Sequence, residues 1–101
     1  MEGTRANENV PIKLLPAKGR TYAPVEEEKV RQVVRDKLLL TSHEAYLSVS
    51  AKVKYAADGT PEAIIAFLNR QGTYTADVFT VFVGSDYAAE RIETGLAVED
   101  D

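Results

Sequence analysis

Two similar pentapeptides bracket the middle of the chain, AADGT at residues 56–60 and NRQGT at residues 69–73. Each has glycine in fourth place and threonine in fifth. This is the pattern of a type I turn followed by a left-handed glycine that opens the next strand. The seven-residue run between them, Glu62 to Leu68, is therefore predicted to be the central strand of an antiparallel meander.

A helix is the alternative for the same run. Thr60 would be its N-cap, Pro61 its first residue, and Gly72 would follow its end. Ile64 and Leu68 would then lie on one helical face. A helix here would turn the chain into an α/β unit with alternating helices and parallel strands.

The segments on either side have clearer periodicity. Valines and a leucine recur at helical spacing from about Val25 to Leu39, with acidic residues near the start and basic residues near the end. Residues 46–55 alternate apolar and polar side chains, and residues 73–83 are rich in β-branched and aromatic residues, so both are predicted strands. Ser85 as a cap and Gly95 as a stop predict a short last helix.

The predicted fold is α+β, with a helix, a three-stranded antiparallel meander and a short C-terminal helix. An additional N-terminal strand at Val10 to Leu15 is left open. We divide the chain into a flexible, mildly basic arm (1–24), one domain (25–95) and an acidic disordered tail (96–101). The length of 101 residues leaves room for one small core.

The net charge of −4 disfavours nucleic acid and anionic membranes as partners. Residues 1–24 nevertheless carry a net charge of +2, which leaves −6 for the rest. The first 24 residues lack the apolar segment of a signal peptide, and no apolar run approaches the roughly 20 residues of a membrane span. With no cysteine to suggest disulfides, we expect a soluble, cytoplasmic protein.

Turn geometry predicts which side chains share a sheet face. If Ala56 faces Thr60 and Asn69 faces Thr73, Lys54 lies opposite Glu62. One face then contains apolar residues with lysines at its margin, and large apolar patches are seldom left in water. The candidate partner-binding residues on this face are Ile64, Leu68, Tyr74, Val78, Phe82, Lys52 and Lys54.

Two other residues are candidates for a catalytic role. His43 is the only histidine and could act as a general base, although a surface position is the alternative. The same register sends Asp77 to the core face opposite Ile65, where burial would raise its pKa unless the strand is an edge. With no cysteine and one histidine, we expect no catalytic site, metal or other cofactor.

The predicted order resembles that of the double-stranded-RNA-binding domain over about residues 25–95. That family binds phosphates with a lysine cluster that opens its last helix. The matching stretch here, GSDYAAERI, has Asp86 and Glu90 instead, so the resemblance implies a layout and no RNA-contacting residue.

The sequence thus predicts a small non-enzymatic interaction domain, such as an accessory subunit, adaptor or inhibitor. It would act through the apolar sheet face, on another protein or as a homodimer. The alternative function is association with nucleic acid through the basic arm, with Lys13, Lys18 and Arg20 as phosphate contacts.

Overall fold

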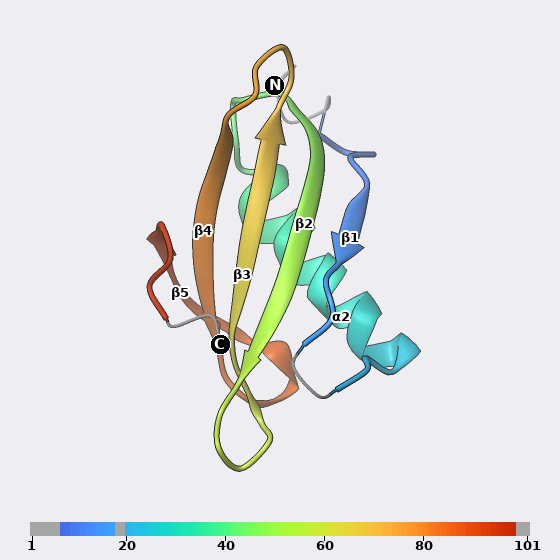
Figure 1. Ribbon diagram of the computed structural model, residues 1–101, viewed down its shortest axis with the longest axis vertical. Helices are drawn as coiled ribbons and strands as arrows, with labels where there is room; N and C mark the ends of the chain where they lie inside the picture. The colour runs from blue at the N-terminus through green and yellow to red at the C-terminus, as the bar shows by residue number, and fades with distance from the viewer. Residues whose placement is uncertain (1–6, 18–19, 99–101) are drawn as a thin grey trace.

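A single five-stranded sheet and one helix form two layers in the computed structural model, which describes residues 7–17 and 20–98 (Figure 1). The spatial order of the strands follows their order in the chain. The β1–β2 pair is parallel and the other three pairs are antiparallel, so the sheet is mixed. The strands are β1 (Ile12–Leu14), β2 (Tyr46–Tyr55), β3 (Pro61–Arg70), β4 (Ala76–Val83) and β5 (Ala89–Thr94).

The helix lies where the sequence predicts it. It consists of α2 (Pro24–Val34) and a wider π-helical turn, η1 (Arg35–Leu39), and it crosses behind the sheet in Figure 1. Proline occupies its first turn, where the missing N–H has no intrahelical partner to lose. In η1 the Leu40 N–H donates to the Arg35 carbonyl at 2.8 Å. The extra residue in this turn places both of its leucines in the core.

The core fills the space between the helix and the inner face of the sheet, the face turned toward α2. It is built from aliphatic side chains of β1, α2, η1, β2, β3 and β4 and from two tyrosines, one in β2 and one in η2. Its buried members are Val10, Ile12, Val30, Val34, Leu38, Leu39, Tyr46, Val49, Ala51, Val53, Ile64, Ala66, Leu68, Val81, Val83 and Tyr87.

The predicted C-terminal helix is wrong. Only a short 3-10 turn, η2 (Ser85–Tyr87), follows β4, and Asp86 and Tyr87 both have φ of 61°. That left-handed conformation stops a right-handed helix, and the chain returns as β5 to pair with β4. A helix of so few residues is marginal in water, and sheet pairing overrides its propensity.

The predicted α-β-β-β-α fold is therefore contradicted, and so is the layout resemblance to the double-stranded-RNA-binding domain. The observed order is β1, α2, β2, β3, β4 and β5. The alternative of alternating helices and parallel strands is also wrong, because among the described strands only β1 and β2 pair in parallel. The middle run, Glu62 to Leu68, is a strand, as the paired turns predict.

The two faces of strand β3 are exchanged relative to those that the turns predicted. The Ala56 N–H does donate to the Thr60 carbonyl at 2.8 Å, but Glu62 is an extra residue that shifts the next pair to Lys54 with Ala63. The β3–β4 turn is longer than expected and pairs Asn69 with Ala76. Each of these register shifts is an odd number of residues, so the first exchanges the two faces of β3 and the second restores the predicted faces of β4. Residues 64, 66 and 68 of β3 therefore lie on the inner face.

The carboxylate of Glu26 connects α2, β2 and η2. Glu26, in the first turn of α2, accepts hydrogen bonds from the hydroxyl of Tyr55 at the end of β2 and from that of Tyr87 in η2. Burial raises the pKa of Glu26, but the two tyrosine hydrogen bonds outweigh it and lower the pKa overall. Burial and the Glu26 hydrogen bond raise the pKa of Tyr55 to about 12.

Much of the predicted arm packs on the body. Within residues 7–17, Asn7, Val10, Ile12 and Ala17 are buried. Residues 1–6 and 18–19 of the arm and 99–101 of the tail lie outside the described residues. Within the part of the chain that the structure describes, no helix is long and apolar enough to cross a membrane.

The helix position can be tested with a matched pair of substitutions. Val34→Asp should lower the free energy of unfolding by several kcal/mol, because it buries an unpaired charge in the core. Val25→Asp, on the same helix at a residue that is largely exposed, should change stability by less than about 1 kcal/mol. Urea unfolding of both variants measures the difference, and equal effects would contradict the assigned helix face.

Candidate functional site

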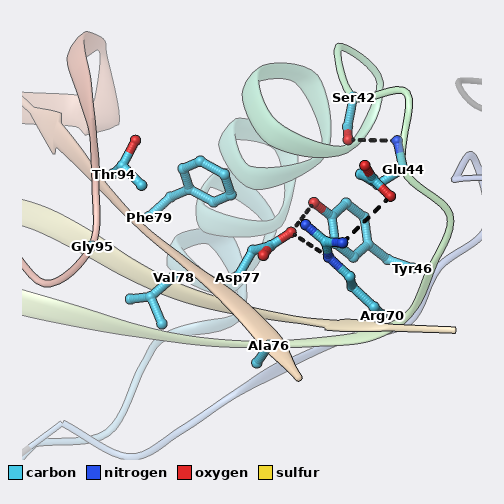
Figure 2. A pocket seen from close by; sticks show the side chains of 10 residues that line it. All are labelled: Ser42, Glu44, Tyr46, Arg70, Ala76, Asp77, Val78, Phe79, Thr94 and Gly95. Atoms are coloured by element: carbon cyan, nitrogen blue, oxygen red, sulfur yellow. Dashed lines mark hydrogen bonds and ion pairs between the residues drawn. The ribbon is translucent and has the colours of Figure 1, made fainter. Parts of the chain in front are cut away.

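A hollow lies where the start of β4 meets the end of β3 and the start of β2 (Figure 2). We call it the Asp77 hollow, and its volume is about 510 Å³. It combines carboxylates, hydroxyls and one guanidinium with apolar walls. Its lining residues are Ser42, Glu44, Tyr46, Arg70, Ala76, Asp77, Val78, Phe79, Thr94 and Gly95.

Strand register brings these side chains together. Asp77 pairs with Leu68 on the inner face, and Arg70 lies two residues beyond Leu68 on the same face. Tyr46 pairs with Arg70 across β2 and β3. The three polar side chains therefore come from the ends of three neighbouring strands.

Arg70 links two carboxylates. Its Nε donates to Oδ2 of Asp77 at 3.0 Å, and its Nη1 lies 3.8 Å from Oε1 of Glu44 (Figure 2). The Tyr46 hydroxyl donates to the same Oδ2 at 2.7 Å. The Arg70 and Tyr46 hydrogen bonds hold the pKa of Asp77 below its usual value, whereas burial and the bond to Asp77 raise that of Tyr46.

The expectation for Asp77 is therefore corrected. It lies on the inner face opposite Leu68, not Ile65, and its pKa is lowered instead of raised. Strand β4 is also not an edge, because β5 pairs with it. The charge is tolerated because its partner guanidinium comes from the neighbouring strand.

Asn7 fixes the loop that carries Glu44. Its amide nitrogen donates to the carbonyls of Leu39 at 3.1 Å and of Glu44 at 2.8 Å, and its amide oxygen accepts the Tyr46 N–H at 3.1 Å. The side chain is fully buried, so it replaces water on backbone groups that the loop leaves unpaired. The position of Glu44 thus depends on a residue 37 places earlier in the chain.

A second hollow of about 300 Å³ shares the Arg70 side chain. We call it the Tyr74 hollow, lined by Leu47, Arg70, Gly72, Thr73 and Tyr74. Leu47 is the extra residue in a β2 bulge and is 61% exposed, and Tyr74, in the β3–β4 turn, is fully exposed. Two large apolar side chains thus flank one hollow in contact with water.

The structure separates the predicted partner-binding residues. Tyr74 and Val78 line the two hollows. Ile64 and Leu68 lie instead in the core, because β3 is reversed. The remaining three, Phe82, Lys52 and Lys54, lie on the outer face, the face away from α2, where Phe82 carries the Arg91 guanidinium 3.9 Å above its ring.

The residues considered for phosphate binding are dispersed. Lys13 is exposed on β1, and Lys18 lies outside the described residues. The Arg20 guanidinium stacks 3.8 Å from the centre of the Tyr55 ring and donates to the Gly59 carbonyl at 3.3 Å. His43, the candidate general base, is exposed and does not line the Asp77 hollow.

Sequence reasoning missed Tyr46, Leu47 and Arg70 as members of a site. One signal was present, because Arg70 and Asp77 are opposite charges on either side of a predicted turn. The described residues hold no group of three or more histidines, cysteines or carboxylates that could bind a metal ion. In comparisons with known proteins, no family model, curated protein or solved structure matches this chain.

Asp77→Asn tests the ionic network. At neutral pH the variant should lose about 1 kcal/mol of unfolding free energy, because Arg70 loses a charged partner in a partly exposed pair. A lowered pKa contributes stability that is fully present above the unfolded value of about 3.9 and is lost as pH falls through the folded value. The gap between wild type and variant should therefore close below about pH 4.

The matched control is Asp36→Asn, which removes an exposed aspartate of η1. Chemical denaturation at a series of pH values between about 2.5 and 7 measures both variants. A gap for Asp77→Asn that stays constant to the lowest pH would contradict the role assigned to its charge.

Proposed function

We propose that this protein is a small interaction domain that binds a protein segment at the end of its sheet, across the Tyr74 and Asp77 hollows. The observation that carries the proposal is the pair of exposed side chains, Leu47 and Tyr74, beside a hollow. Exposed large apolar groups that border a concavity are typical of contact surfaces. Tyrosine and arginine are also the residues that most often dominate binding energy at interfaces.

The β2 bulge supports this interpretation. A regular strand would give every residue a partner, whereas the register shift between Tyr46 and Ser48 leaves Leu47 unpaired and turned to solvent. Bulges commonly redirect a side chain next to functional sites. The bulge therefore presents an apolar anchor that a plain strand would have packed elsewhere.

The charges indicate the chemistry of the partner. Two carboxylates, Asp77 and Glu44, face one guanidinium, Arg70, so the Asp77 hollow has a net charge of −1. Among the described residues, both donors to Asp77 use Oδ2. Its Oδ1 can thus accept a hydrogen bond from a partner, and a lysine or arginine side chain fits this combination of charge and acceptor.

The partner that fits both hollows is an extended segment with an apolar side chain near a basic one. The apolar side chain would contact Leu47 and Tyr74, and the basic one would enter the Asp77 hollow. Arg70 separates the two hollows and fixes the spacing between these two side chains. An enzyme or a nucleic-acid function has no comparable support, because His43 stands apart and Arg20 packs on Tyr55.

Selection from a random peptide display library tests the proposal with the full chain. Selected peptides should carry a basic residue close to an apolar one, and Tyr74→Ala or Leu47→Ser should weaken their binding at least about tenfold while leaving the melting temperature nearly unchanged. Fluorescence polarisation with labelled peptides measures the affinities.

Leu96→Ser is the matched control, since it truncates a similarly exposed leucine that lines neither hollow. It should leave binding unchanged. If Leu96→Ser weakens binding as much as Leu47→Ser, or if the selected peptides are acidic, the proposed surface is wrong.

A further inference from the structure

Strand β5 is an open edge of the sheet. It is the last strand in the spatial order, and all six of its residues are exposed. Ile92 is 43% exposed, although it pairs with the buried Val81 of β4. An exposed edge offers unpaired N–H and C=O groups to another strand.

The register shows which groups face outward. The Gly95 N–H donates to the Val78 carbonyl at 2.7 Å, so this pair is hydrogen-bonded. Hydrogen-bonded and non-bonded pairs alternate along antiparallel strands. Glu93 and Arg91 therefore direct their backbone groups to β4, and those of Ile92 and Thr94 point to the open edge.

We propose that β5 pairs antiparallel with β5 of a second copy of this chain, with a two-fold axis at Ile92. The two Ile92 residues would form a hydrogen-bonded pair and bury their side chains against each other. Arg91 of each copy would lie opposite Glu93 of the other, which makes two cross-strand ion pairs. The contact is self-complementary, as a two-fold interface requires.

Charge selects this register from its neighbours. Only registers that pair outward residues with outward residues are allowed, so the strand slides in steps of two. One step in one direction places Arg91 opposite Arg91, and one step in the other places Glu93 opposite Glu93. Like charges directly opposite one another destabilise both alternatives.

Both charged side chains are accessible for this exchange. Arg91 and Glu93 form a pair within β5 at 2.8 Å, and their side chains are 60% and 46% exposed. Both project from the outer face, where Arg91 also covers Phe82. In the dimer, the one pair within each strand is exchanged for two pairs between the strands, and the two sheets join into one.

Sedimentation equilibrium from roughly 10 µM to 1 mM, the range in which small interfaces associate, tests the proposal. Wild type should dimerise, and Arg91→Glu or Glu93→Arg should each weaken dimerisation at least about tenfold by placing like charges opposite one another. The double variant Arg91→Glu/Glu93→Arg reverses both partners and should restore the wild-type constant to within about threefold.

Thermal melting of each variant shows that the fold is kept, which is expected because both positions are exposed. Ile92→Pro provides an independent check, since it removes an edge-facing N–H and leaves the β4–β5 bonds in place. It should abolish the dimer. A wild type that remains monomeric throughout, folded single variants that dimerise like wild type, or a double variant that is not restored would each overturn the proposal.

The dimer edge and the peptide-binding surface share Thr94, which ends β5 and lines the Asp77 hollow, but their tests change different residues. Tyr74→Ala and Leu47→Ser should leave the dimerisation constant unchanged, because neither residue is part of β5. Peptide binding should likewise survive Ile92→Pro. Failure of one proposal therefore leaves the other standing.

Discussion

The arrangement of the fold depends most on the two hydrogen bonds that the Glu26 carboxylate accepts. It accepts hydrogen bonds from Tyr55, 29 residues away, and from Tyr87, 61 residues away. These contacts fix the start of the helix against the end of β2 and against the turn that leads into β5. Tyr87 adopts a left-handed backbone conformation that costs energy for a residue other than glycine, and this contact offsets part of that cost. The contact therefore stabilises the turn that brings the chain back as β5 to pair with β4.

Local patterns were sufficient for most elements and insufficient for their faces. Helical spacing in α2, alternation in β2 and the paired glycine turns around β3 are properties of neighbouring residues, so the sequence could predict them. The reversal of β3 depends on one extra residue, Glu62, and on the length of one turn. Neither feature has a local signal. The prediction of a helix at the end of the chain is wrong for a related reason, because strand β5 forms only through its pairing with β4.

The candidate site was accessible from the sequence only in part. Tyr74 and Val78 were predicted as members of an apolar sheet face and Asp77 as a single carboxylate, but the site depends on which strand ends meet. Arg70 joins Asp77 only in the observed register, and Leu47 becomes exposed only through a bulge. The β5 edge was hidden by the predicted helix. Sites built from strand ends therefore require the register to be known first.

The parallel pairing of β1 with β2 means that the two edges of the sheet form at different stages of folding. β1 pairs with β2 across 37 residues that include the helix, whereas the antiparallel pairs close through short turns. Loop-closure entropy favours early formation of the antiparallel ladder and late arrival of β1. Local opening of the native protein is expected to begin with the strand that forms last, so β1 is the strand expected to detach without global unfolding. Such an opening uncovers the edge of β2 along Val49 and Ala51, which are fully buried, and adds to the open edge of β5 a second edge at which chains can aggregate.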